Sequence, residues 1–305
     1  MKRRRGEGKT GRRGDDEPFL PVPPSSSLPI SVSGLPIITL LTDFGTADYF
    51  VGAMKGVILS LNPQARIVDI THEIPAQDIE AGAFTLLGAY RSFPQGTVHV
   101  AVVDPGVGSR RRALLVEAGD QFFVGPDNGI FSYVYEQAPK ARVFEVNNKD
   151  YFRHPVSPTF HGRDVFAPVA AAIANGTSPR ELGREVKSPV RLESLKLTNS
   201  KKNGELRARI IHIDRFGNCA INLTAQDLTR EMIEKGSSLT INGVKIRSFR
   251  TFFSDGPNLR NEVFGIWGST GFLEICATNR SAAKILKAKR GQPVRVHVRH
   301  EGLPR

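Results

Sequence analysis

The sequence predicts two domains: an N-terminal α/β domain with a mainly parallel sheet flanked by helices, and a smaller, all-β, barrel-like C-terminal domain. Strand and helix patterns alternate in the order β-α-β-α-β through residues 37–102, which is typical of a parallel sheet covered by helices. Beyond residue 203 the pattern changes to short strand candidates separated by turn residues. The chain has 305 residues, which is enough for two domains of ordinary size.

The N-terminal domain, expected at residues 37–187, combines short apolar segments with amphipathic ones. The expected strands are rich in β-branched residues and lie at 37–41, 67–70, 97–102, 113–117 and 121–124. The expected helices carry apolar residues at helical spacing and lie at 50–61, 79–90 and 165–175. Asn62-Pro63 ends the first of these helices, and Asp164 is placed as the N-cap of the last.

The C-terminal domain, expected at residues 204–300, follows a polar segment at 188–203 that contains Pro189 and is interpreted as a linker. Its expected strands are short and lie at 207–213, 220–223, 239–241, 244–249, 272–277 and 294–298. Asn242-Gly243 between two of these strands predicts a type I′ hairpin turn.

The composition, with 40% hydrophobic and 24% charged residues, indicates a soluble globular protein. No apolar run reaches the roughly 18 residues that a membrane span needs. Residues 1–36 start with the basic run Met1-Lys2-Arg3-Arg4-Arg5, but no apolar region follows, and Gly, Pro, Ser and Arg are frequent. We therefore expect a disordered basic leader rather than a targeting signal.

The formal net charge of +12 raises the hypothesis of nucleic-acid binding. The basic residues are spread along the chain beside acidic or apolar ones, and no basic stripe interleaved with aromatic residues is present. Solvated surface charge is the favoured interpretation, with nonspecific binding at low salt left open. Cys219 and Cys276 are single, widely separated thiols, which fits a reducing cytoplasm, and no close set of histidines predicts a metal.

The segment Val103-Asp104-Pro105-Gly106-Val107-Gly108-Ser109-Arg110-Arg111 is the strongest candidate for a site. It places a carboxylate at the carboxyl end of a buried strand, then a loop with two glycines, then an arginine pair. In open α/β sheets that edge is where ligands bind. An aspartate and an arginine held there could bind a charged substrate or lower the pKa of a water molecule. The alternative is a structural turn with a surface ion pair.

Two further candidates lie in the same domain. Asp43 ends the first strand, where a carboxylate can accept both hydroxyls of a ribose; the alternative is a helix cap or an Asx turn. His161 precedes a helix N-terminus, a position that disfavours imidazolium and keeps the ring able to accept a proton. The alternative for His161 is a structural hydrogen bond.

Two candidates lie in the C-terminal domain. Asp214-Arg215-Phe216-Gly217-Asn218 combines a carboxylate, an aromatic face and an amide, which could bind an ammonium group and a base edge or form an ordinary turn. The small residues around Ser269 could hold a carboxylate or make a tight turn. Ser269 does not sit in a Gly-x-Ser-x-Gly elbow, so a serine hydrolase is not expected.

Between Ile37 and about Val298, six motifs in order resemble the S-adenosyl-L-methionine hydrolase (hydroxide adenosyltransferase) family, which is related to the fluorinases and chlorinases. They are Leu41-Thr42-Asp43-Phe44-Gly45, Val68-Asp69-Ile70-Thr71-His72, Val103-Asp104-Pro105-Gly106-Val107-Gly108, Pro126-Asp127-Asn128-Gly129, Thr159-Phe160-His161-Gly162-Arg163-Asp164 and Asp214-Arg215-Phe216-Gly217-Asn218.

The resemblance implies an α/β domain followed by a β-barrel, assembled as a homotrimer with active sites between the N-terminal domain of one subunit and the C-terminal domain of its neighbour. It implies a catalytic set of Asp104, Arg111 and His161. The substrate-binding residues that it implies serve the ribose, the adenine and the methionine head; they are Asp43, Asp214, Phe216, Asn218, Phe252 and Ser269. Thr270 stands where the halogenases carry an arginine.

The implied activity is hydrolysis of S-adenosyl-L-methionine to adenosine and L-methionine, by attack of an activated water or hydroxide on C5′. The sulfonium is already a good leaving group, so no metal or redox cofactor is required. Two alternatives stay open: a halogenase on the same fold, whose members carry Tyr where Asp104 stands, and a non-catalytic protein that binds S-adenosylmethionine or nucleic acid. No specific nucleic-acid partner and no membrane partner is expected.

Overall fold

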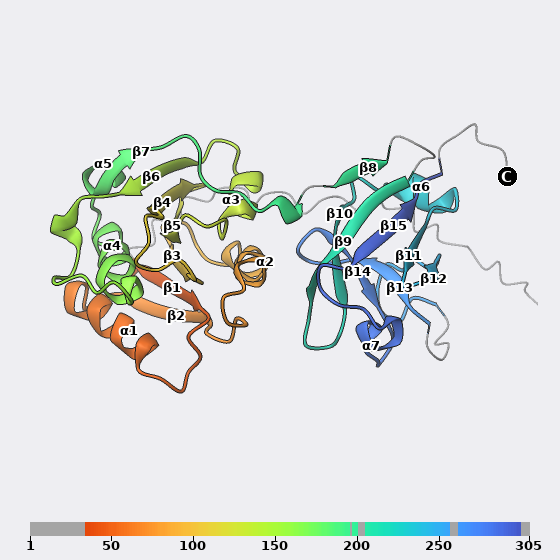
Figure 1. Cartoon of the computed structure of the whole chain (residues 1–305), viewed down its shortest axis with the longest axis horizontal. Coiled ribbons are helices and arrows are strands. Elements are labelled where there is room, and N and C mark those ends of the chain that lie inside the picture. Colours follow the sequence, from red (N-terminus) through yellow and green to blue (C-terminus); the bar gives the residue numbers. More distant parts are fainter. Residues whose placement is uncertain (1–33, 196, 201–204, 257–261, 300–305) are drawn as a thin grey trace, which may run out of the picture. The chain divides into compact units, whose positions relative to one another are not determined.

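The computed structural model describes residues 34–195, 197–200, 205–256 and 262–299. Two sheets organise this part of the chain, the first between residues 37 and 185 and the second between residues 198 and 297 (Figure 1). Apart from its last three residues, the leader predicted at 1–36 lies outside the described residues. The domain boundaries at 187 and 204 stay a prediction.

The first sheet has the strand order β2-β1-β3-β5-β4-β6-β7. Its strands are β1 (Ile37–Thr42), β2 (Arg66–Thr71), β3 (Val98–Val102), β4 (Ala113–Ala118), β5 (Gln121–Pro126), β6 (Arg142–Val146) and β7 (Gly183–Glu185). The pairs from β2 to β5 are parallel, and those from β5 through β4 and β6 to β7 are antiparallel. The predicted α/β fold class is confirmed, with β6 and β7 as strands that the sequence patterns did not predict.

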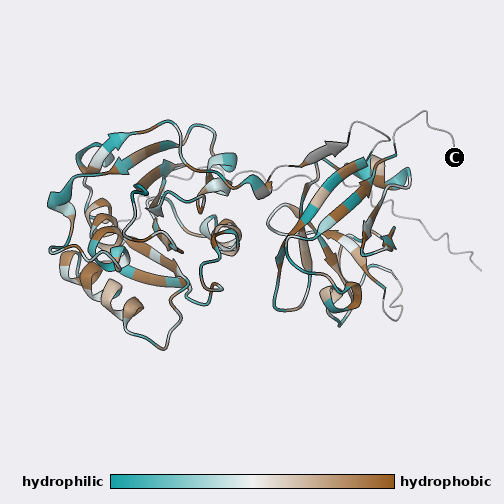
Figure 2. Ribbon diagram, viewed as in Figure 1, coloured by the Kyte–Doolittle hydropathy of each residue, from teal (hydrophilic) through white to brown (hydrophobic). Residues whose placement is uncertain are grey.

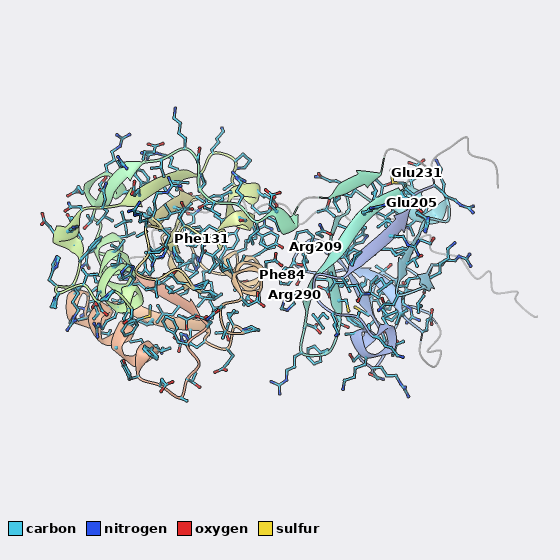
Figure 3. All side chains as sticks on the ribbon, viewed as in Figure 1. Phe84, Phe131, Glu205, Arg209, Glu231 and Arg290 are labelled. Atoms are coloured by element: carbon cyan, nitrogen blue, oxygen red, sulfur yellow. The ribbon has the colours of Figure 1, made fainter. Side chains whose placement is uncertain are left out.

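Helices cover both faces of this sheet. Helices α1 (Phe50–Leu61) and α4 (Ala167–Ala174) share a core with Ile38 and Leu40 of β1, whereas α2 (Ile79–Tyr90) and α3 (Ser132–Gln137) share one with Leu41. Phe84 on α2 and Phe131 beside α3 belong to this second layer (Figure 3). Because successive side chains of a strand point to opposite faces, a continuous apolar run buries both faces. The predicted helices at 50–61 and 79–90 are confirmed.

The last predicted helix of this half begins earlier than expected. A single π-helical turn at Gly162–Phe166 precedes α4, and the short helix α5 (Pro179–Leu182) follows it. The cap position of the π turn belongs to His161. The placement of Asp164 as an N-cap is therefore wrong: its buried carboxylate instead accepts bonds from Arg163, Arg153 and the backbone N–H of Ser157.

The second sheet is antiparallel, with the order β12-β11-β15-β9-β10-β14-β13 and β8 paired to β9. Its strands are β8 (Thr198–Ser200), β9 (Glu205–Ile213), β10 (Cys219–Thr224), β11 (Ser238–Ile241), β12 (Val244–Ile246), β13 (Phe264–Trp267), β14 (Phe272–Cys276) and β15 (Pro293–His297). A bridge between Phe249 and Gly265 joins the chain after β12 to β13, so the sheet nearly closes. The predicted barrel-like all-β architecture is confirmed.

The buried hydrophobic side chains of the second sheet form one large core and a separate small cluster of Phe264, Ile266 and Cys276. Along β9 hydrophobic and hydrophilic residues alternate (Figure 2), and Ala208 and Ile210 point into that core. Two short helices, α6 (Arg230–Glu234) and α7 (Ala282–Leu286), lie in its connections, and Leu286 is buried in the same core. Cys219 and Cys276 are buried free thiols.

The segment interpreted as a linker is held by specific bonds. The backbone N–H of Val190 donates to Asp127 (2.8 Å), and that of Leu192 donates to the hydroxyl of Ser132 (2.9 Å). At its other end β8 pairs with β9. Helix α2 also contacts the second sheet, where Arg209 on β9 forms an ion pair with Glu80 (2.8 Å). Within the residues that the structure describes, no helix is both long enough and apolar enough to cross a membrane.

Candidate active site

Asp104 and Arg111 form a buried ion pair at the carboxyl end of β3. The Arg111 guanidinium donates from Nε to Oδ1 of Asp104 (2.9 Å) and from Nη2 to Oδ2. The two side chains are only 4% and 10% exposed, respectively. A bidentate pair of this kind fixes the orientation of the guanidinium, and little water screens its charge. The surface ion pair considered as an alternative does not describe this arrangement.

Gly108 allows the loop between these residues to approach the loop that carries His161. Gly108 has φ +76°, and a Cβ added to it would overlap the backbone carbonyl oxygen of Pro158. Any other residue at this position would push the two loops apart. The close approach therefore brings Arg111 within hydrogen-bond distance of His161, although 50 residues separate them in the sequence.

His161 completes a cluster of three side chains. Its Nδ1 lies 2.9 Å from Nη2 of Arg111. Because a guanidinium can only donate, Nδ1 must be the acceptor, and the neutral ring carries its proton on Nε2. Burial and the neighbouring Arg111 lower the pKa of His161, against smaller opposing effects of Asp104 and Asp164. The histidine is therefore held neutral at physiological pH, with a lone pair directed at a fixed cation.

Asp43 faces the same cleft as Asp104. Strands β1 and β3 are parallel neighbours, and the pairing of Thr42 with Val102 brings the ends of both strands to one edge. A cleft of about 410 Å³ there is lined by Asp43, Phe44, Phe50, Gln77, Asp104, Pro105, Val107, Thr159 and Phe160. We call it the N-terminal cleft. Asp43 accepts from the backbone N–H of Gln77 (2.8 Å), and it does not cap α1.

The C-terminal candidates gather in the turn between β9 and β10. Asp214 accepts from both the backbone N–H (2.8 Å) and the side-chain amide (2.9 Å) of Asn218. These bonds orient the amide of Asn218 toward a cleft of about 600 Å³, lined by Phe216, Asn218, Phe253, Ala277, Asn279, Arg280 and Ser281. We call it the C-terminal cleft. It shares no lining residue with the N-terminal cleft.

Phe253, rather than the expected Phe252, lines the C-terminal cleft. Phe253 packs edge-on against the buried Phe264, with ring centroids 6.1 Å apart, and it remains 47% exposed. Phe252 is 57% exposed and is not among the lining residues. Which of the two adjacent phenylalanines lines the cleft depends on the backbone turn after β12, and the sequence patterns did not predict that turn.

Ser269 is not gathered with the other C-terminal candidates. It is exposed in the turn between β13 and β14, whereas the turn containing Asn218 meets the opposite end of β14, because Cys219 pairs with Ile275. Three residues of strand, or about 10 Å, separate the two turns. Only an extended ligand could contact both of them.

Two residues that line the N-terminal cleft, Gln77 and Phe44, were not among the predicted site residues. Gln77 orients Asp43 through its backbone, with φ +63°, and Phe44 lies 6.1 Å from Phe160 between ring centroids. A backbone donor leaves no sequence signal. In the described ranges, no group of three or more His, Cys, Asp and Glu side chains could hold a metal ion.

Comparison with known proteins gives a family for both halves of the chain. The model of the SAM hydroxide adenosyltransferase N-terminal domain matches residues 38–183, and that of the C-terminal domain matches residues 208–295. A protein named (R)-S-adenosyl-L-methionine hydrolase from Methanocaldococcus jannaschii is 39% identical over 265 residues, which cover 83% of this chain and 92% of the relative.

Two more relatives extend the comparison. A fluorinase from an Actinoplanes species is 27% identical and covers 87% of this chain and 98% of the relative. The crystal structure of an uncharacterised conserved protein from Thermotoga maritima has a TM-score of 0.76 and 32% identity, and the match covers 85% of this chain and 99% of that one.

Proposed function

The chain belongs to the SAM hydroxide adenosyltransferase family, and from that premise we propose that it hydrolyses S-adenosyl-L-methionine to adenosine and L-methionine. The observation that carries the proposal is the contact of Asp104, Arg111 and His161, with Asp104 and Asp43 facing one cleft. A cation, a carboxylate and a neutral imidazole in contact are the groups that water activation needs.

The substrate determines what the protein must supply. In S-adenosylmethionine C5′ is bonded to a sulfonium, so methionine leaves as a neutral thioether and needs no general acid. The proposed reaction therefore requires no metal or redox cofactor. What remains is to hold a water in line with the C5′–S bond and to remove its proton. The oxygen bonds to C5′, the C5′–S electron pair goes to sulfur, and the proton goes to a base.

Each residue of the cluster has a proposed part in that step. Arg111 stabilises the hydroxide as it forms, because a fixed cation in a poorly hydrated site acts strongly on a developing anion. Asp104 fixes the guanidinium and orients the water. In this proposal the water replaces Nη2 of Arg111 at Nδ1 of His161, so that the Nδ1 lone pair takes the proton, and the Asp104 carboxylate offsets part of the positive charge that results.

The remaining candidates are proposed to bind the substrate. Asp43 would accept the two ribose hydroxyls, and the amide of Asn218 would pair with the edge of adenine. Asp214 retains free lone pairs beside its bonds to Asn218 and would bind the methionine ammonium group. Phe216 and Phe253 offer faces for the adenine ring. Ser269 is proposed to contact the far end of the methionine.

We further propose a homotrimer in which the N-terminal cleft of one subunit meets the C-terminal cleft of its neighbour. Two features support this arrangement: the proposed groups lie in clefts without a common lining residue, and Phe216 is 76% exposed. Phe253 in the same lining is also exposed, and exposed apolar groups that gather in one place mark surfaces that a partner or ligand covers. A cytoplasmic location is proposed because both cysteines are buried reduced thiols.

Chromatography of the nucleoside products tests the proposed function. The protein is incubated with S-adenosylmethionine, with and without added chloride. We expect adenosine and methionine in equal amounts under both conditions, because the Asp104 carboxylate repels a halide. A chlorinated nucleoside would assign the chain to the halogenases, and binding without any product would assign it to the non-catalytic binding proteins.

Mixing two impaired variants, assayed at a substrate concentration well below KM, tests the shared site. Asp104→Ala disables one cleft and Asn218→Ala weakens the other. After subunit exchange, verified by mass spectrometry of the mixed assemblies, some sites combine two intact halves, and we expect partial recovery of activity. No recovery despite verified exchange would mean that each site is built within one chain.

A further inference from the structure

Arg111 and His161 line a second cavity, which is separate from the N-terminal cleft that Asp104 lines. This cavity has a volume of about 560 Å³, and its other lining residues are Arg110, Arg112, Ala113, Glu145, Val146, Asn147, Lys149, Phe152, His154, Pro155, Val156 and Val165. It shares no lining residue with the N-terminal cleft, which contains Asp43 and Asp104. The proposed catalytic cluster therefore spans two cavities, with Asp104 in the lining of the first and Arg111 and His161 in the lining of the second, and the substrate contacts proposed above account for only the first.

The walls of this second cavity carry an excess of positive charge. Its cationic side chains are Arg110, Arg111, Arg112 and Lys149, with His154 and His161 beside them. Glu145 is the one carboxylate among the lining residues, and Arg184 already neutralises it through bonds of 2.8 and 2.9 Å. Two of the arginines are also paired, Arg111 with Asp104 and Arg112 with Asp127.

Arg110 and Lys149 remain without a counter-ion. In the part of the chain that the structure describes, no carboxylate forms an ion pair with either side chain, and both are exposed to solvent. The backbone near Lys149 is held in place, because Nε2 of His154 donates to the Lys149 carbonyl oxygen (2.9 Å). Arg110 and Lys149 are unpaired, and they line the same cavity as the fixed cation Arg111. Together the three positive charges attract an anion.

We infer that this cavity binds an oxyanion of the size of phosphate, with Arg110 and Lys149 as its main charged contacts. A guanidinium and an ammonium group are the side chains that bind phosphate oxygens in proteins, the first as a planar fork and the second as a mobile point charge. The volume accommodates either inorganic phosphate or the phosphate group of a small ester.

A bound anion should also change the rate of the proposed hydrolysis, and this part of the inference rests on the proposed function. A bound anion beside Arg111 offsets part of the positive potential of the guanidinium. Arg111 then stabilises the forming hydroxide less, and kcat falls. Because the anion and the substrate occupy different cavities, they do not compete. Bound phosphate should therefore lower kcat and leave KM unchanged.

Phosphate binding is measured first, without any turnover, by ³¹P line broadening and by calorimetry on the full-length protein. The double variant Arg110→Ala/Lys149→Ala should raise the Kd of phosphate by about tenfold or more. The matched control Arg66→Ala/Lys245→Ala removes the same two kinds of charge from exposed strand positions and should leave the Kd within about twofold. An unchanged Kd in the first variant would overturn the inference.

Turnover is measured next, with phosphate replacing chloride at constant ionic strength. We expect kcat to fall with phosphate in the natural protein and in the control variant, and the fall to disappear in Arg110→Ala/Lys149→Ala. A rise in KM alone would place the anion in the substrate cleft and overturn the inference. The Kd of glycerol phosphate is measured in a parallel series. A lower Kd for glycerol phosphate than for inorganic phosphate identifies an ester as the preferred ligand, and a higher one identifies the free ion. If the protein binds phosphate but does not hydrolyse S-adenosylmethionine, the proposed function is refuted and the inferred anion site is not.

Discussion

The N-terminal and C-terminal clefts are built in opposite ways. At the first, the Asp104 carboxylate in the lining is already paired with Arg111, and the two side chains are only 4% and 10% exposed, respectively. At the second, the largest feature is the ring of Phe216, which is 76% exposed beside the amide of Asn218. In the proposed reaction, the first cleft carries the chemistry beside the ribose contact of Asp43, and the second recognises the adenine.

The difference follows from the energetics of each task. Stabilising a forming hydroxide requires a charge that does not have to reorient, so the cluster is fixed by a bidentate ion pair and by the close approach at Gly108. Binding a flat base requires an apolar face and one directed amide, and both gain most when the ligand excludes water from them. Changes in the two clefts should therefore affect different kinetic parameters.

The largest effect is expected for Arg111→Ala. Loss of a fixed charge in a desolvated site should lower kcat by about 100-fold or more, while KM changes little because the sulfonium substrate is itself a cation. Arg111→Lys should recover only part of the rate, since an ammonium group cannot form the same fork with Asp104. Steady-state kinetics with both variants check this. An intact kcat with a raised KM would make Arg111 a binding residue.

Asn218→Ala should show the reverse pattern. Removing a directed amide at the C-terminal cleft should raise KM by about tenfold, with kcat changed by less than about threefold. Circular dichroism provides the control, because Asn218 also donates to Asp214 and its loss relaxes the turn. If kcat fell and KM stayed constant, the division between chemistry and recognition would be wrong.

The two adjacent phenylalanines give a smaller, matched test within the C-terminal cleft. Phe253→Ala should raise KM by about fivefold, because its ring lines the cleft and supplies area for stacking. Phe252→Ala should leave KM within about twofold, because that ring lies outside the lining. Parallel KM measurements decide between them, and the opposite ranking would restore Phe252 as the aromatic contact.

The pH dependence sharpens the account of the N-terminal cleft. Burial and Arg111 lower the pKa of His161, so the ring stays neutral below the ordinary histidine pKa of about 6.5. A reaction that needs neutral His161 should keep its kcat as the pH falls through that value and lose it only at lower pH. In Arg111→Ala part of the lowering disappears, so the acidic limb of the residual activity should move to higher pH. A limb that stays in place would show that another group titrates.

Local patterns predicted the elements well where they repeat over many residues. The helices at 50–61 and 79–90 have clear apolar spacing, and both exist within those bounds. The short strands β6 and β7 were not predicted, because five and three residues carry too little periodicity to stand out. The N-cap assigned to Asp164 failed because tertiary contacts with Arg163 and Arg153 claim its carboxylate.

For the candidate site, the sequence predicted residue types better than it predicted neighbours. Asp104 and Arg111 share one loop, so their spacing already suggested a contact. His161 lies 50 positions after Arg111, so its place before a helix made it a candidate, but only the family motifs grouped it with Arg111. The contact of Gln77 with Asp43 uses a backbone N–H, and Phe253, which lines the C-terminal cleft, packs against the distant Phe264. Neither has a signature in the local sequence.

Turnover in ¹⁸O-enriched water tests the central claim most directly, because the claim is that a water activated by Arg111 and His161 attacks C5′. Mass spectrometry of the products should find one ¹⁸O in adenosine, at the 5′ oxygen, and none in methionine. The rate of incorporation should fall in parallel with kcat in Arg111→Ala. Adenosine without label, or label in methionine, would contradict attack of water at C5′.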